Sequence, residues 1–265
     1  MLPDADSAGQ SFAGRSFQPH PFAGDTGESD PELARALRSF HALARSLPEQ
    51  RPYEQVGLAW EAVVDALRGA RVLSPLIAQS GDFGLTDQGR VVEKTQELSV
   101  IHVEGPDGRP VAPIFSDVAS LTAWRSDARP IPVESSRAAV AAAADGLAVL
   151  VLNPGGDTQV CFRRGALESL ARGSSYLAPW RDPVIAGAIE DGLRSQSALI
   201  PHHRVIPGDP LQQLSGPEIV VVVGVIPGLD AAELESTLAA VSVAWSESEI
   251  LSSKVDGLGI KVIPV

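Results

Sequence analysis

The stretch of sequence that decides the fold runs from Val111 to Asn153 and reads VAPIFSDVASLTAWRSDARPIPVESSRAAVAAAADGLAVLVLN. Its apolar spacing changes from that of a strand to that of a helix and back again, twice. Residues 111–115 are a short apolar run, and Ser116-Asp117 then offers a side-chain oxygen that can cap a helix. The first half of the stretch therefore predicts a strand followed directly by a helix.

The second half repeats this order. Residues 131–133 are expected to be extended, because each proline pushes the residue before it out of the α region. Ser135 or Ser136 can cap a second helix, whose alanine-rich run over 138–144 has high helix propensity. Gly146 is placed to end that helix.

The last strand of the stretch is the unbroken apolar run Leu147–Leu152. Successive strand side chains point to opposite faces, so Leu150 and Val151 are expected to be buried on opposite sides of the sheet. Such a run indicates a central strand with helices on both faces. We expect the alanine-rich helix and a later helix over 164–172 to cover those two faces.

The remaining elements follow from the same patterns. Further helices are predicted after Asp30, at about 53–69, 164–172 and 182–195, and from Asp230 to about Trp245. Further strands are predicted at about 72–78, 98–103, 158–162, 218–226 and 258–262. Residues 79–95 and 197–216 show no strong period and are expected to be irregular.

These elements predict an α/β fold, with α+β as the alternative: a mixed sheet flanked by helices, together with a second, smaller α/β domain. Residues 1–29 are rich in Gly, Ser, Pro and Asp and are expected to form a flexible N-terminal tail. The periodic pattern lapses between residues 174 and 183. We therefore expect a first domain over 30–173 and a smaller C-terminal domain over 182–265.

Composition excludes several classes of protein. The formal net charge of −12 opposes binding to nucleic acid and to anionic membranes. A single cysteine, Cys161, excludes an internal disulfide framework. The most apolar run, Ile219–Ile226, is far shorter than the roughly 20 residues that a membrane-spanning helix needs. The N-terminus, with Asp4 and Asp6, lacks the features of a signal peptide, so a soluble cytoplasmic protein is expected.

Few residues suggest chemistry. Asn153, Gly155 and Gly156 follow the best predicted strand and form a candidate ligand loop, although a strand follows them and a plain turn is favoured. The neighbouring His202 and His203 are interpreted as a surface loop pair without a metal-binding pattern. Cys161 is interpreted as a buried small hydrophobe. No catalytic, cofactor-binding or metal-binding residues are predicted, and no cofactor.

Most of the chain resembles one family. The segments RVLSPLIAQ (71–79), VEGPDGRPVAPIFSDVASLTAWRSDARPIPV (103–133) and SSRAAVAAAADGLAVLVLNPGG (135–156) are similar to the SseB family of bacteria, in its actinobacterial branch. The resemblance implies an SseB-type N-terminal domain followed by a smaller C-terminal one. The family is linked by name to enhanced serine sensitivity, and it offers no agreed catalytic residues to carry over.

Two functions remain open from the sequence. The first is a non-catalytic scaffold that binds a protein partner or forms a homo-oligomer, because no acid/base or nucleophile constellation is present and several apolar stripes need partners. The alternative is a domain that binds a small molecule, such as an amino acid or metabolite, with the turn 153–157 near the mouth of its pocket. An enzyme is the third choice.

Overall fold

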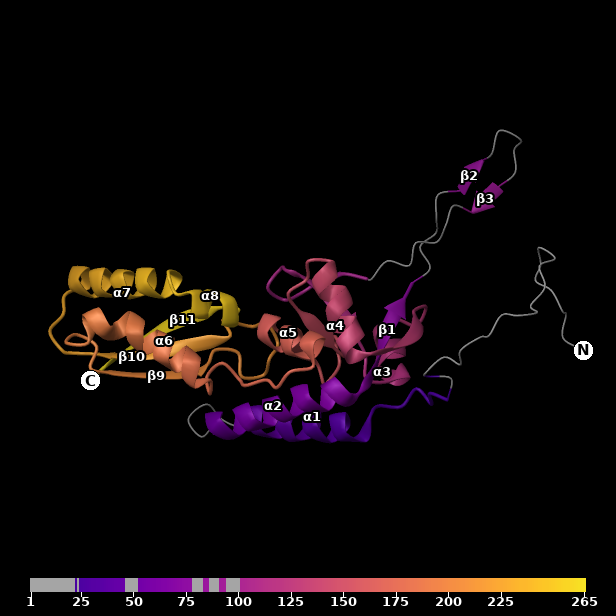
Figure 1. Cartoon of the computed structure of the whole chain (residues 1–265), viewed down its shortest axis with the longest axis horizontal. Helices are drawn as coiled ribbons and strands as arrows, with labels where there is room; N and C mark the ends of the chain where they lie inside the picture. The colour runs from indigo at the N-terminus through magenta and orange to yellow at the C-terminus, as the bar shows by residue number, and fades with distance from the viewer. Residues whose placement is uncertain (1–21, 23, 46–51, 78–82, 86–90, 94–100) are drawn as a thin grey trace, which may run out of the picture.

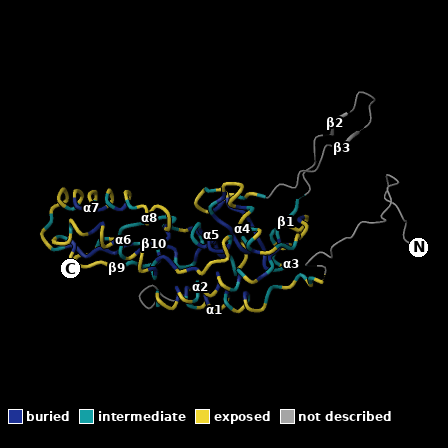
Figure 2. Tube along the Cα trace, in the orientation of Figure 1, coloured by how far each residue is buried: buried dark blue, intermediate teal, exposed yellow. Residues whose placement is uncertain are grey.

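The computed structural model describes residues 22, 24–45, 52–77, 83–85, 91–93 and 101–265. Its helices and strands form two lobes, one made by the elements up to α5 and one by the elements from α6 onward (Figure 1). The mixture of helices with parallel and antiparallel strands confirms the predicted mixed α/β fold. Figure 2 shows that buried chain lies inside both lobes.

The first lobe begins with two helices that pack against each other, α1 (Pro31–Ala44) and α2 (Tyr53–Gly69). The side chain of Asp30 caps α1 by accepting hydrogen bonds from the N–H groups of Glu32 and Leu33. Both helices turn apolar stripes toward a common core that includes the fully buried Trp60.

The sheet of the first lobe has two parts. In one, β1 (Arg71–Leu76) pairs antiparallel with β6 (Arg129–Glu134). In the other, the strand order is β4 (Val103–Glu104), β5 (Pro110–Ile114), β7 (Leu150–Leu152) and β8 (Val160–Phe162), and only β5 and β7 are parallel. A single bridge between Leu73 and Phe115 joins the two parts. The helices of this lobe that follow β5 are α3 (Val118–Trp124), α4 (Ser135–Ala144) and α5 (Arg164–Arg172).

Both Leu150 and Val151 are buried, as predicted, but helices do not cover both faces of their strand. Leu150 faces the main core, where α4 and α5 pack against each other on the same side of the sheet. Val151 faces a smaller cluster that is covered by Leu214, which belongs to the loop between β9 and β10. The expected pair of helices on opposite faces is therefore wrong, because one face is covered by a loop from the second lobe.

The second lobe is a three-stranded sheet with helices on one side. Its strand order is β11 (Leu258–Pro264), β10 (Ile219–Val225), β9 (His202–Pro207), with β11 parallel and β9 antiparallel to β10. Alternate β10 residues from Ile219 to Val225 pack against a cluster contributed by the helices. These helices are α6 (Pro183–Leu193), α7 (Ala231–Ser246) and α8 (Glu249–Lys254), and the short 3-10 helix η2 (Arg194–Gln196) follows α6.

Several local predictions need correction. The stretch 197–216, expected to be irregular, contains strand β9. The stretch 79–95 contains the short antiparallel pair β2 (Phe83–Leu85) and β3 (Val91–Glu93). Neither Ser135 nor Ser136 caps α4, because the helix begins at Ser135 itself and the capping residue Glu134 makes no side-chain hydrogen bond.

The ends of the predicted domains can be compared only in part with the structure. Residues 1–21 and 23 of the expected tail lie outside the described residues. Residues 24–29 are held by the first lobe: Asp25 forms an ion pair with Arg71, and the carbonyl of Gly27 accepts the N–H of Val118. The division into domains at 30–173 and 182–265 stays a prediction.

Candidate functional site

The turn predicted as a ligand loop is held by its own side chains. Asn153 adopts a left-handed backbone conformation with φ of 51° and is almost fully buried. Its Oδ1 accepts the N–H of Ser116 at 2.9 Å, and its Nδ2 donates to the hydroxyl groups of Ser116 and Thr158. Asn153 therefore ties the end of β7 to the end of β5, with its polar atoms already used.

The two glycines of this loop also serve the turn. Gly155 has φ of 76° and donates its N–H to Oε1 of Gln159 at 2.6 Å. The N–H of Gly156 donates to the carbonyl of Asn153. These contacts support the turn interpretation, and a ligand-binding role of Asn153, Gly155 and Gly156 stays untested.

The histidine pair and the cysteine that the sequence draws attention to both lie in strands. His202 and His203 are exposed and begin the edge strand β9, so they lie in a strand rather than in a loop. Cys161 is fully buried in β8, and this burial, followed by the nearby charge of Asp209, raises the pKa of its thiol to about 12. Among the described residues, no group of three or more His, Cys, Asp or Glu side chains could hold a metal ion.

The candidate site is an apolar groove of about 370 Å³ on the helix side of the first sheet. We call it the α4 groove. Its floor is formed by β5 and β7, one wall by the β1–β6 pair and the other wall by α4. The residues that line it are Ser74, Pro75, Leu76, Ala112, Pro113, Ile114, Ile131, Val133, Arg137, Ala138, Ala141 and Leu150.

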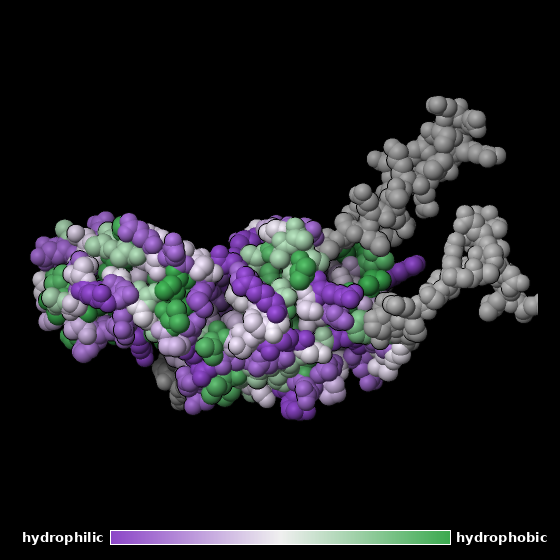
Figure 3. Space-filling model, in the orientation of Figure 1, coloured by the Kyte–Doolittle hydropathy of each residue, from purple (hydrophilic) through white to green (hydrophobic). Residues whose placement is uncertain are grey.

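The groove exists because the two parts of the sheet diverge. After the bridge between Leu73 and Phe115, residues 74–76 of β1 form no further ladder with β5. On the opposite wall, Ala138 and Ala141 are too small to fill the space that opens. Figure 3 shows apolar surface near the end of β1. The result is a pocket whose walls are carbon-rich and whose mouth is open to solvent.

The polar groups of the α4 groove are few. Arg137 lies at its edge, is exposed, and pairs with Glu134. Ser74 contributes a hydroxyl group, and no carboxylate lines the groove within the described part of the chain. A general acid or base, a nucleophile with its base, or an oxyanion hole requires convergent polar groups, which this lining does not supply.

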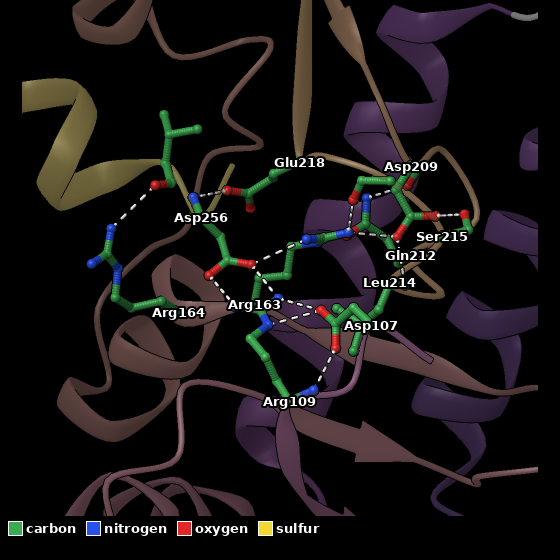
Figure 4. Close-up of polar contacts among 12 residues, drawn as sticks. Asp107, Arg109, Arg163, Arg164, Asp209, Gln212, Leu214, Ser215, Glu218 and Asp256 are labelled. Atoms are coloured by element: carbon green, nitrogen blue, oxygen red, sulfur yellow. Dashed lines mark hydrogen bonds and ion pairs between the residues drawn. The ribbon is translucent and has the colours of Figure 1, made fainter. Parts of the chain in front are cut away.

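A buried ion cluster joins the two lobes (Figure 4). Arg163, next to β8, is 3% exposed and donates to Asp209 at 2.7 Å and to Asp256 at 3.1 Å. Asp209 is fully buried and also accepts the N–H of Leu214 and the hydroxyl group of Ser215. Because removing one member would leave a buried charge unpaired, this cluster fixes the loop that carries Leu214 onto the first sheet.

The same cluster extends through Asp256 to the hairpin between β4 and β5. Arg109 binds both carboxylate oxygens of Asp256, at 2.9 and 2.8 Å, and also pairs with Asp107. Burial would raise the pKa of Asp256, but the hydrogen bonds and charges of Arg109 and Arg163 outweigh it and hold that pKa below its usual value. The carboxylates of Asp209 and Asp256 are thus paired within the cluster, which indicates a structural role, although the buried Nε of Arg163 has no hydrogen-bond partner among the described residues.

Glu218 lies beside this cluster without an arginine of its own. Its Oε2 accepts the N–H of Asp256 at 2.7 Å, and its side chain is buried. Burial raises the pKa of Glu218 to about 7, against the opposing hydrogen bond from Asp256 and the charge of Arg163. A carboxyl group of this kind changes its charge near neutral pH.

The α4 groove could not be found from the sequence as a site. Its lining comes from four separate segments of the chain, and only their pairing in space creates the opening. The alanine-rich run 138–144 predicts a helix, and Ala139 and Ala142 of that helix lie in the core. Ala138 and Ala141 instead face the groove. The available signal was the surplus of small side chains on a second face of this helix.

Comparison with known proteins gives one match. Residues 43–169 match the family model described as the SseB protein N-terminal domain, which spans α2 through most of α5 and includes the whole lining of the α4 groove. No curated protein and no solved structure matches the chain. No helix among the described residues is both long and apolar enough to cross a membrane.

Proposed function

Because residues 43–169 place this chain in the SseB family, we propose that it is a non-catalytic interaction protein of that family, whose α4 groove binds an apolar segment of a protein partner. The single observation that carries this proposal is the groove itself: about 370 Å³, open at the surface, walled by strands and a helix, and nearly free of polar side chains. Burial of apolar side chains against such a surface is favourable in free energy.

The chemistry of the lining favours a peptide over an amino acid or similar metabolite. A free amino acid carries an ammonium and a carboxylate group, and both lose their hydration on binding. Arg137 could pair with the carboxylate, but none of the described residues that line the groove has an acidic side chain to receive the ammonium group. An internal peptide segment has no such charges, and its apolar side chains suit the apolar surface formed by Leu76, Ile114 and Ile131.

A selection of random peptides displayed on phage tests the proposal. The wild-type protein is the bait, and Ala141→Glu is the matched variant, because it places a charge inside the groove on an alanine that is only half-buried. We expect the selection to yield apolar peptides that bind the wild type. Their affinity for Ala141→Glu should be at least about tenfold lower, because binding would remove water from the introduced carboxylate.

Ala144→Glu is the control, because Ala144 is exposed on the same helix and does not line the groove. It should bind the selected peptides as the wild type does. A selection that yields no apolar peptide, or peptides that bind wild type and Ala141→Glu equally, would contradict the proposal.

A further inference from the structure

Strand β11 forms one edge of the sheet in the second lobe, since the strand order is β11-β10-β9 and no described strand pairs with the outer side of β11. The N–H of Val265, just after the strand, donates to the carbonyl of Val225 in β10. Because backbone groups alternate in direction along a strand, Leu258, Ile260 and Val262 turn their N–H and C=O groups away from β10. We call the outward backbone groups of these three residues the β11 edge.

A groove of about 300 Å³ lies on the helix side of the β11 edge. We call it the α7 groove. The side chains of Leu258 and Ile260 form part of it, and both are only half-buried although they face the helices. Among the described residues that line it, none belongs to β9 or β10, so it lies toward the outer side of the sheet. The lining consists of Ser242, Trp245, Ser246, Leu251, Ser252, Val255, Leu258 and Ile260.

The opposite face of the same sheet is basic. Lys261 lies on this face, because its neighbours Ile260 and Val262 pack toward the helices. The strand register places Val222 beside Lys261 and Arg204 beside Val222, in one row across the sheet. Both cations are exposed, and within the described part of the chain neither forms an ion pair. The residues of this basic face are His202, Arg204, Ile206, Val220, Val222, Gly224, Gly259, Lys261 and Ile263, and none of them is acidic.

The chemistry of the β11 edge selects its occupant. A row of N–H and C=O groups at every second residue is matched by the backbone of another extended strand. In such a strand, side chains opposite Leu258 and Ile260 would point toward the α7 groove, which is lined largely by carbon. Side chains at the alternate positions would lie beside Lys261 on the basic face, where carboxylates are favoured. The complementary strand therefore alternates apolar and acidic residues.

A second copy of this chain matches the edge poorly. Two β11 strands paired edge to edge about a twofold axis would bring Lys261 of both copies onto one face of the joined sheet, where like charges repel. Nucleic acid is a poor match as well. The basic face has no Phe, Tyr or Trp on which bases could stack, and the chain as a whole carries a net charge of −12.

We propose that the β11 edge binds, as an added fourth strand, an extended segment of a partner protein in which apolar and acidic residues alternate. Leu258, Ile260 and Val262 hydrogen-bond with the backbone of this segment. The α7 groove receives its apolar side chains, and Lys261 pairs with a carboxylate on the other face. This site lies in the second lobe, is separate from the α4 groove and does not depend on the function proposed for that groove.

A peptide of four Val-Glu repeats with capped ends is the probe, and the same peptide with lysine in place of glutamate is its control. Amide exchange of the full chain is followed by NMR. The Val-Glu peptide should bind saturably and slow the exchange of the Leu258, Ile260 and Val262 amides by about tenfold or more. The amides of Gly259 and Ile263 point toward β10 and should change little. The Val-Lys peptide should bind about fivefold more weakly or not at all.

Lys261→Glu is the test variant and Arg204→Glu its matched control. Both replace an exposed cation of the basic face, but β10 and β11 separate Arg204 from the added strand. Lys261→Glu should weaken binding of the Val-Glu peptide by about fivefold and strengthen that of the Val-Lys peptide. Arg204→Glu should change both affinities much less.

Three results would overturn the proposal. The first is that the Val-Glu peptide leaves the three outward amides of the β11 edge unprotected, or that single-stranded DNA protects them and the peptide does not. The second is an equal loss of affinity in both variants, since general charge attraction would then suffice. The third is protection of the same amides that rises with protein concentration in the absence of peptide, because a second copy would then occupy the edge.

Discussion

Glu218 shows how one buried residue can set the pH dependence of the whole fold. Its pKa is about 7 in the folded protein and 4.5 as an ordinary glutamate. Below about pH 4.5 the carboxyl group is protonated in both states, and burial then costs little. As the pH rises toward 7, the unfolded chain ionises while the folded protein must keep the proton or bury a charge. The stability that depends on a protonated Glu218 is therefore lost as the pH rises through that interval.

Glu218→Gln should remove this loss. Glutamine is neutral at every pH and can still accept the N–H of Asp256. We expect the variant to be more stable than the wild type by about 3 kcal/mol near pH 8, the equivalent of the pKa difference, and similar to it near pH 4. Urea denaturation of both proteins at the two pH values measures this. If the free energies of unfolding of wild type and variant changed equally with pH, Glu218 would be ionised in the folded protein at no cost in stability.

At the scale of elements, the loop that carries Leu214 replaces a helix as the cover of the second sheet face. Leu214 is 3% exposed, has a φ of 58°, and packs with Val151 and Cys161. The backbone N–H of Cys161 also donates to the carbonyl of Gln212 at 2.7 Å. The loop thus adds both apolar and hydrogen-bonding contacts to the edge of the sheet.

Leu214→Ala should lower the free energy of unfolding by about 2–5 kcal/mol, because it opens a cavity over Val151. Leu177→Ala is the matched control: Leu177 is 49% exposed, and its loss should change stability by less than about 0.5 kcal/mol. Both are measured by denaturant unfolding. Equal effects of the two changes would mean that the loop does not seal this face.

Helix α7 begins at a complete capping box. Oδ1 of Asp230 accepts the N–H of Glu233 at 2.9 Å, and Oε2 of Glu233 accepts the N–H of Asp230 at 3.0 Å. Asp230→Ala should therefore cost about 1 kcal/mol of stability, whereas Glu235→Ala, an exposed position in the same helix, should cost much less. An unchanged denaturation midpoint for Asp230→Ala would count against the cap.

At the scale of the whole molecule, the sequence predicts those features that are determined by residues close together in the chain. Asp117 and Asp230 cap helices as expected, since a cap needs only its own turn. The sequence does not predict strand β9, because its residues HHRVIP do not alternate in polarity; the strand is formed by its pairing with β10. Leu214 packs with Val151, which lies more than sixty positions earlier in the chain, and the periodicity of neither segment predicts that contact.

The candidate sites were less predictable than the fold for the same reason. The α4 groove arises where β1 leaves β5, which is a property of how two parts of a sheet are joined.

The central claim is that the α4 groove is where a protein partner binds, and hydrogen exchange tests it most directly. The full chain is saturated with an apolar peptide from the selection described above, and amide exchange is compared with that of the free protein. We expect added protection in residues 72–77, 110–115 and 137–142, three of the segments that line the groove. Protection that appears instead along β9 or elsewhere in the second lobe, or no change at all, would contradict the claim.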